Sequence, residues 1–191
     1  ADGMEGHLRG GGVAGGADII LIPEVPFEPQ RVYDLLQHHM ERASGGTRRI
    51  NRYAVVVISE GVAAKGGDIV TVDKGLDAFG HVKLGGVGSV LSDDIRKNTR
   101  YDSRHVVTGY AQRGGPPTPV DRVMGFLFGT AAVGAVQQKR WGMMVSARGV
   151  APACEISLVT LEDAVGKLNL LDVNRYYDTE RYNARRNFFA E

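Results

Sequence analysis

The sequence has a single cysteine, Cys154, among 191 residues. One thiol excludes an internal disulfide framework and a thiolate zinc cluster, and it suits the reducing cytoplasm. Charge of either sign is also not in excess, because 23 Lys and Arg residues face 22 Asp and Glu residues. Nucleic-acid-binding domains usually carry a strongly basic face. We therefore expect a cytoplasmic protein without a nucleic-acid partner.

Long hydrophobic runs are missing as well. We find no apolar run of the roughly 18 to 20 residues that a bilayer crossing needs, and the first residues do not have the layout of a signal peptide. Hydrophobic residues make up 43% of the chain and charged residues 24%. This composition is typical of a soluble globular protein with a substantial core, so we expect no membrane partner.

Apolar runs alternate with amphipathic segments along the chain. Residues 17–23 (ADIILIP) form a nearly continuous apolar run, which is typical of a strand buried on both faces. Residues 28–43 place apolar side chains at helical spacing after Pro29, a favoured first helical residue. Similar patterns predict strands or helices at 52–59, 87–100, 104–108, 118–138, 141–147 and 155–161. The alternation predicts an α/β fold with a parallel sheet.

Two segments do not fit the alternation of strands and helices. Residues 65–86 are rich in glycine and predict an insertion loop or small hairpin, and the fold of the tail from residue 173 is not predicted.

Residues 10–15 match G-x-G-x-x-G but precede a strand, whereas a dinucleotide loop follows one, so tight helix-to-strand packing is favoured over nucleotide binding. His38 and His39 are helix neighbours that cannot both face one metal ion.

The stretch from Gly109 to Pro117, here named the glycine-arginine loop, lies between a predicted strand and a predicted helix, where ligands dock in α/β proteins. Its glycines allow close backbone approach, the helix start adds positive potential, and Arg113 offers a fork that suits phosphate. Arg104 adds a second cation, and Glu60 follows another strand. These residues predict a sugar-phosphate site; a proline-rich turn with solvated arginines and a loop salt bridge is the alternative.

Residues 109–122 (GYAQRGGPPTPVDR) resemble the signature of the 6-phosphofructokinase family, G-[HY]-x-Q-R-G-G-x-P-x-x-x-D-R. Residues 15–24 resemble its G-G-A-D-x-x-x-I-P-E segment, and residues 56–61 its V-x-S-E-G strand. Order and spacing match from about residue 10 to residue 139, and the likeness is weak beyond residue 148.

The resemblance implies a parallel-sheet three-layer α/β sandwich of phosphofructokinase type, incomplete at its N-terminus. Residues 1–111 would form the small domain that binds fructose 6-phosphate. Residues 112–149 would return to the donor-binding domain, and residues 150–191 would pack back on the substrate domain or form a tail.

The resemblance also implies roles for individual residues. Glu60 would bind the fructose hydroxyls, and Arg113 and Arg104 the 6-phosphate. Tyr110 stands where many relatives have histidine; it can donate one hydrogen bond to the phosphate but cannot become cationic. In the family, the position of Arg104 reaches into a neighbouring subunit, which implies a homodimer or homotetramer.

Two family motifs are absent in their expected order: the G-G-D phosphate loop and the T-[IV]-D-x-D segment that carries the catalytic base. Residues 71–74 (TVDK) resemble the second only superficially, because they follow Glu60 and have lysine where a second acid is expected. We therefore expect no catalytic residue in this chain and no activity from it alone.

The function that the resemblance implies is part of a glycolytic 6-phosphofructokinase. The complete enzyme would transfer a phosphoryl group from ATP or pyrophosphate to the 1-hydroxyl of fructose 6-phosphate, with Mg²⁺ as cofactor in the other half. The alternative is a noncatalytic, regulatory module that binds a sugar phosphate. Asp18, Arg49 and Arg52 are candidate contacts for an allosteric effector.

Overall fold

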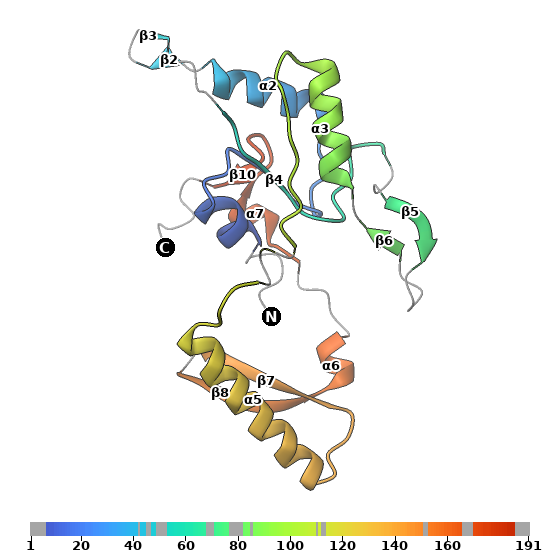
Figure 1. The fold of residues 1–191 in the computed structure, drawn as a ribbon, viewed down its shortest axis with the longest axis vertical. Coiled ribbons are helices and arrows are strands. Elements are labelled where there is room, and N and C mark those ends of the chain that lie inside the picture. Colours follow the sequence, from blue (N-terminus) through green and yellow to red (C-terminus); the bar gives the residue numbers. More distant parts are fainter. Residues whose placement is uncertain are drawn as a thin grey trace. The chain divides into compact units, whose positions relative to one another are not determined.

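The computed structural model describes residues 7–41, 43–44, 47–48, 53–67, 71–76, 82–84, 86–109, 111, 114–150, 153–165 and 170–185. Contacts divide the chain into two compact units (Figure 1). Unit 1 comprises residues 1–107 and 169–191, and unit 2 comprises residues 108–168. The domain boundaries predicted at residues 111 and 149 remain predictions.

Unit 1 is built around a short parallel pair of strands, β1 (Ile19–Leu21) and β4 (Val56–Ile58). All three residues of β1 are buried, as the apolar run predicted. A parallel pair needs a crossover connection, and α2 (Pro29–Met40) lies in it. Pro29 occupies the first turn of α2, and Leu36 points into the same core as β1. The first strand and first helix predicted from the sequence are thus confirmed.

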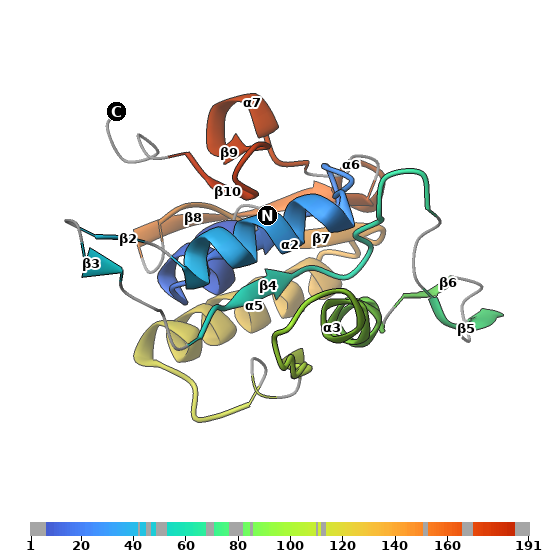
Figure 2. The same cartoon turned by 90° about the horizontal axis from the view of Figure 1, so that it is seen from above.

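A second helix, α3 (Val87–Asn98), lies next to α2 (Figures 1 and 2). Its residues Leu91 and Ile95 are buried in the core that contains β1. The hydroxyl of Tyr33 on α2 donates a hydrogen bond to the Asp94 carboxylate on α3. The two helices are therefore joined by both an apolar and a polar contact.

Gly10 and Gly12 of the G-x-G-x-x-G stretch lie in a short π-helix, η1 (His7–Ala14), that precedes β1, and Gly15 follows directly after this helix. A Cβ added to Gly12 would meet the Cδ1 of Ile20 at 2.4 Å, and one added to Gly15 would meet the Gly11 carbonyl oxygen at 2.5 Å. Both distances are too short for a real Cβ. Gly12 thus allows close packing of this helix on β1, as the sequence predicted, whereas Gly15 allows the chain to leave the helix close to its own backbone.

The C-terminal segment, whose fold the sequence did not predict, belongs to unit 1. It contains α7 (Val173–Tyr176) and the antiparallel strands β9 (Tyr177–Asp178) and β10 (Asn183–Ala184). Tyr177 is 1% exposed, and its hydroxyl donates to the Ile20 carbonyl at 2.6 Å. The segment thus completes the core beside β1.

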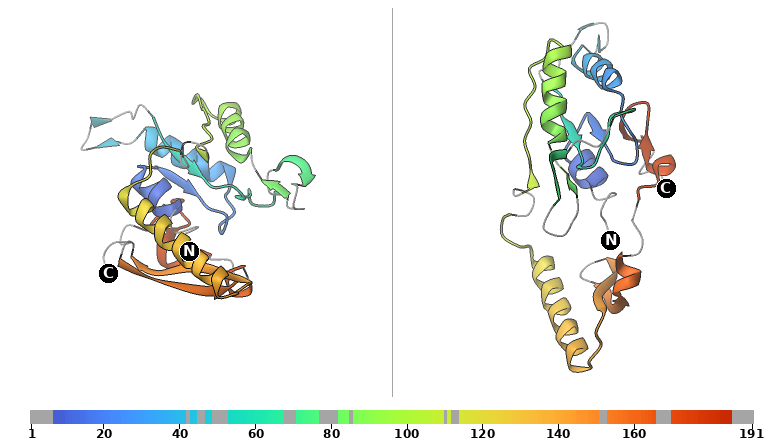
Figure 3. Two further views of the ribbon diagram at one scale, coloured as in Figure 1. Left: turned by 60° about the horizontal axis from the view of Figure 1, so that its bottom comes forward. Right: turned by 90° about the vertical axis from the view of Figure 1, so that its right-hand side faces the viewer.

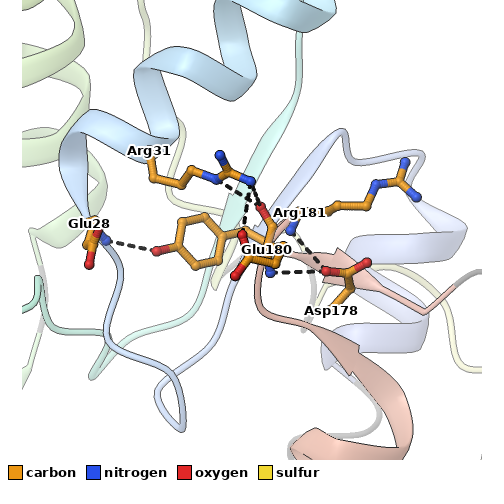
Figure 4. A network of polar contacts seen from close by, with 6 residues as sticks. Glu28, Arg31, Asp178, Glu180 and Arg181 are labelled. Carbon is orange, nitrogen blue, oxygen red and sulfur yellow. Dashed lines mark hydrogen bonds and ion pairs between the residues drawn. The ribbon is translucent and has the colours of Figure 1, made fainter.

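Polar contacts hold the same segment against the start of α2 (Figure 4). The Tyr182 hydroxyl accepts a hydrogen bond from the Glu28 backbone N–H at 2.9 Å. The Arg31 guanidinium donates to the Glu180 backbone carbonyl at 2.7 Å and 2.9 Å. The turn between β9 and β10 is therefore fixed to the start of α2 by hydrogen bonds that each join a side chain to a backbone group.

Unit 2 consists of one long helix, α5 (Pro119–Gln137), and an antiparallel hairpin of β7 (Met143–Val150) and β8 (Ala153–Thr160), followed by α6 (Leu161–Val165). The helix packs along the hairpin (Figure 3). The helix and both strands were predicted, but the strands pair with each other as an antiparallel hairpin instead of belonging to a parallel sheet. Ala135 is the buried apolar residue of this unit among those that the structure describes.

Helix α5 is both long and rich in apolar residues. It has 19 residues with a mean hydropathy of 1.2, and by length and composition alone such a helix is able to cross a membrane. The search for uninterrupted apolar runs missed it because Asp121, Arg122 and several small residues interrupt the apolar ones. The described residues contain no second helix of this kind.

Two further hairpins lie in unit 1. β2 (Ala43–Ser44) pairs with β3 (Thr47–Arg48), and β5 (Thr71–Leu76) pairs with β6 (Val82–Leu84), which confirms a hairpin within residues 65–86. The strand predicted at residues 104–108 is wrong. These residues have no regular structure and pair with none of the described strands.

The α/β class is confirmed, because helices and strands alternate through unit 1. Among the described residues the strands form two-stranded pairs, and β1 with β4 is the parallel one. The three-layer parallel sandwich stays a prediction.

Candidate functional site

Glu60 stands at the carboxyl end of the parallel pair. The Ser59 N–H donates to the Leu21 carbonyl at 3.1 Å, so the ladder between the two strands extends one residue beyond β4. The chain then turns at Gly61, which has a φ of 83° that favours glycine. Glu60 is exposed, and its carboxylate makes no hydrogen bond or ion pair with the described part of the chain. Ligands of α/β folds bind at this end of a strand, so Glu60 is placed where the sequence predicted.

Arg104 lies in the irregular segment of unit 1 that follows α3. Its side chain is 89% exposed, and its Nε lies 3.6 Å from an Asp102 carboxylate oxygen. Exposed ion pairs contribute little, about 0–1 kcal/mol, because water screens them and the side chains lose freedom. The guanidinium is therefore free to exchange this weak contact for a ligand anion.

The glycine-arginine loop leads into α5 in unit 2. Gly115 has a φ of 92°, a conformation that glycine adopts readily. The next residues to Pro117 are exposed and have no regular structure. Tyr110 and Arg113, the predicted phosphate contacts on this loop, lie outside the described residues, as do Arg49 and Arg52 of the candidate effector set.

The start of α5 is capped by its own side chains. The Thr118 hydroxyl accepts from the Asp121 N–H at 3.3 Å, and the Asp121 carboxylate accepts from the Thr118 N–H at 2.7 Å. The hydrogen bonds from the Thr118 hydroxyl and N–H lower the pKa of Asp121, so the carboxylate is ionised at neutral pH. A negative charge here offsets the positive potential of the helix start. The sequence analysis counted that potential toward anion binding, and the capping box reduces it.

Asp18 lies beside a pocket of about 530 Å³ in unit 1. One of its carboxylate oxygens accepts from the Val55 N–H at 2.8 Å, and the other lies 3.2 Å from His39 Nδ1, an ion pair when the imidazole is protonated. The pocket is lined by charged and polar side chains, which include Arg31, Asp34, His38, His39, Arg181 and Asn183. Asp18 therefore has structural contacts of its own in addition to its predicted effector role.

The sequence analysis did not single out Arg31, His38 and Arg181 as lining residues. The first two are seven positions apart, which places them on one face of a helix, so helical spacing was a usable signal. Arg181 comes from the C-terminal turn that packs against α2, and no local pattern connects it to this pocket.

The described residues hold no group of three or more His, Cys, Asp or Glu side chains that fits a metal ion. His39 pairs with Asp18, and the expectation that His38 and His39 do not form a metal site stays a prediction.

Comparison with known proteins finds a family model that matches the chain. The family model "Phosphofructokinase" matches residues 7–136. The chain is 41% identical over 170 residues to a pyrophosphate–fructose 6-phosphate 1-phosphotransferase of Amycolatopsis methanolica, covering 88% of this chain and 46% of that protein. It is 36% identical over 171 residues to an ATP-dependent 6-phosphofructokinase of Mycobacterium leprae, covering 90% of this chain and 47% of that protein.

The fold is similar to that of a solved pyrophosphate-dependent phosphofructokinase from Nitrosospira multiformis. The TM-score is 0.61 at 18% sequence identity, over 87% of this chain and 37% of the other. The chain thus spans about half the length of the curated relatives it matches.

Proposed function

This chain belongs to the phosphofructokinase family, and on that premise we propose that it is the fructose 6-phosphate-binding part of a phosphotransferase. The complete enzyme transfers a phosphoryl group from ATP or pyrophosphate to the 1-hydroxyl of the sugar. The observation that carries the proposal is that the family match, residues 7–136, contains the acidic strand end at Glu60 and the whole motif at 109–122. Relatives named for either donor match the chain, so the proposal includes both donors.

In this proposal the chain binds and orients the sugar phosphate. Glu60 accepts hydrogen bonds from fructose hydroxyls, while Arg104 and Arg113 donate to the 6-phosphate, with one further hydrogen bond from Tyr110. Hydrogen bonds to charged groups contribute about 1.5–3 kcal/mol each, so two arginines supply roughly 3–6 kcal/mol of phosphate binding. Glu60 and Arg104 belong to unit 1, and the other two residues to unit 2.

The donor, its Mg²⁺ and the catalytic base belong, in the same proposal, to the half of the enzyme that this chain does not span. The family segment that carries the catalytic base is not recognisable in this sequence, so the proposal gives no acid of this chain that role. What the chain contributes to the rate is the positioning of the acceptor hydroxyl, together with neutralisation of the sugar's phosphate charge.

Two finer parts of the proposal concern regulation and assembly. The pocket beside Asp18 is lined by Arg31 and Arg181 as well as by the carboxylates of Asp18 and Asp34, and the two guanidinium groups are the proposed contacts for an anionic effector. The family position of Arg104 supports a homodimer or homotetramer in which this residue reaches a neighbouring site.

The test is steady-state kinetics of an enzyme that joins this chain to the rest of the family fold. We expect Arg113→Ala to raise KM for fructose 6-phosphate at least tenfold and to leave KM for the donor unchanged, because the arginine touches only the sugar. Arg140→Ala removes an exposed arginine of unit 2 that lies outside the motif and is the control. An unchanged sugar KM in the first variant would refute the assignment.

The 191-residue chain by itself should bind fructose 6-phosphate and show no turnover with either donor. Isothermal titration and a coupled assay measure the two properties. Turnover by the purified chain would contradict the placement of the base and donor elsewhere, whereas absence of sugar-phosphate binding in the complete enzyme would contradict the proposed substrate.

A further inference from the structure

The two strands of the parallel pair separate at their carboxyl ends and pair again a few residues later. The last hydrogen bond of the ladder runs from the Ser59 N–H to the Leu21 carbonyl at 3.1 Å. Pairing resumes where the Phe27 N–H donates to the Ala63 carbonyl at 3.1 Å and the Phe27 carbonyl accepts from the Lys65 N–H at 2.7 Å. The two intervening segments are therefore tied to each other at both of their ends.

Each intervening segment makes one turn. We name residues 22–25 the first turn, which the Val25 N–H closes by donating to the Ile22 carbonyl at 3.2 Å. Residues 60–61 form the second turn, which carries Glu60. Because the two segments share both pairing points, a displacement of the first turn is transmitted through packed backbone to the second.

Glu24 fixes the first turn to the core of unit 1. Its Oε1 accepts a hydrogen bond from the Leu171 N–H at 3.0 Å. Leu171 is buried in the same apolar cluster as Val62, the residue that follows the second turn. The donor therefore belongs to a part of the core that does not move freely, and the bond holds the first turn in place.

The structure uses Glu24 as a hydrogen-bond acceptor and makes no use of its charge. Its second carboxylate oxygen, Oε2, is buried and has no hydrogen-bond partner in the described part of the chain. The ion pairs between described residues do not include this carboxylate either. A glutamine side chain has nearly the same shape and keeps one acceptor oxygen, so it can make the same contact with Leu171.

We infer that Glu24 is a positioning residue for the sugar site. Its hydrogen bond to Leu171 holds the first turn, and the first turn holds Glu60 at the carboxyl end of β4. The inference deepens the proposed function and rests on it, because Glu60 is the proposed contact for the fructose hydroxyls. A binding group must be held close to its productive position, so a looser second turn binds the sugar less well.

Steady-state kinetics of the enzyme that joins this chain to the rest of the family fold test the inference. We expect Glu24→Ala to raise KM for fructose 6-phosphate about three- to tenfold, the range that corresponds to one lost hydrogen bond. The donor KM should stay unchanged, because the two turns carry a sugar contact only. Glu24→Gln should restore the sugar KM to within about twofold of that of the unsubstituted enzyme.

Tyr177→Phe is the matched control for a general loss of stability. It removes another hydrogen bond of the unit 1 core, the one to the Ile20 carbonyl, and should lower the melting temperature without changing the sugar KM. Hydrogen exchange supplies a second measurement. The amides of Gly61 and Val62 should exchange faster in Glu24→Ala than in Tyr177→Phe, because only the first variant loosens the two turns.

Glu60→Gln separates failure of the inference from failure of the proposed function. If this variant leaves the sugar KM unchanged, the proposed role of Glu60 is wrong and the inference falls with it. If Glu60→Gln raises the sugar KM and Glu24→Ala does not, the inference alone is wrong.

Two further results would overturn the inference. One is an equal rise of the sugar KM in Glu24→Ala and Tyr177→Phe, since lost stability would then explain both. The other is a rise in Glu24→Gln as large as that in Glu24→Ala, since the charge of Glu24 would then act on the ligand directly.

Discussion

Replacing Gly12 by alanine should destabilise unit 1, whereas replacing Gly11 should not. A Cβ at Gly12 would lie 2.4 Å from Ile20 Cδ1 and 2.9 Å from its Cγ1, and a Cβ at Gly11 would meet nothing within 4 Å. Ile20 is 1% exposed, so its side chain has no free space to move into. Overpacking of this kind costs about 1–3 kcal/mol.

The comparison of the two variants isolates the clash. Neither glycine has a positive φ, and each alanine gains about 0.5–1 kcal/mol because glycine loses more backbone entropy on folding. We therefore expect Gly11→Ala to be neutral or slightly stabilising, and the difference between the variants to equal the clash, about 1–3 kcal/mol. For a chain of this size that difference lowers the melting temperature by roughly 2–12 °C.

Urea unfolding followed by far-UV circular dichroism measures both free energies, and hydrogen exchange of the β1 amides locates the effect. Equal stabilities of the two variants would refute the packing argument. A loss of nucleotide binding by Gly12→Ala without loss of stability would instead favour the phosphate-loop interpretation of residues 10–15, which the sequence analysis set aside.

Two tyrosines give further predictions. Tyr177 donates to the Ile20 carbonyl inside the core, so Tyr177→Phe should lower the free energy of unfolding by about 1–3 kcal/mol. Tyr53→Phe, at a side chain that is 73% exposed, should change it by less than about 0.5 kcal/mol; equal losses in urea titrations would contradict the contact. Burial, with the hydrogen bond to Asp94, raises the pKa of Tyr33 from 10.0 to about 12. A raised pKa adds stability that is complete below pH 10 and is lost as the pH rises through 12. The melting temperature should therefore fall less steeply between these two pH values in the Tyr33→Phe variant than in the unsubstituted chain. Equal slopes in the two proteins would argue against this linkage.

Local signals predicted the elements whose formation depends on local chemistry. The apolar run at 17–23 became the buried strand β1, and Pro29 begins a helix because its fixed φ suits the first turn. Thr118 and Pro119 likewise mark the start of α5. In each case the residue that acts as the signal also makes the contact that stabilises the element.

Elements that depend on distant partners were not predictable in the same way. The strand expected at 104–108 is absent because a strand needs a neighbour, and Val106 and Val107 remain exposed without one. The C-terminal turn forms because Tyr177 and Tyr182 reach β1 and the start of α2. Nothing in the spacing of a tyrosine-rich tail identifies these partners, which lie more than 150 residues away in sequence.

In the candidate site, too, the features that depend on local sequence were the predictable ones. The position of Glu60 at the carboxyl end of β4 follows from strand order alone, and the structure has it there. The capping of α5 by Asp121 was also present in the sequence, as a threonine followed three residues later by an acid. Thr118 and Asp121 also belong to the stretch that resembles the family motif, so the same residues carry two signals, one for a helix start and one for a phosphate site.

Helices α2 and α5 show why one pattern places a helix at a surface and another in an interior. On α2 the residues away from the core are Gln30, Asp34 and Gln37, all exposed and polar. Water solvates that face, so α2 needs no further partner. On α5 the corresponding positions include Phe126 and Val133, whose exposure is unfavourable by about 25 cal/mol for each Å² of apolar surface. Selection for a solvent-facing helix does not produce such a face. The composition of α5 is therefore typical of an interior helix.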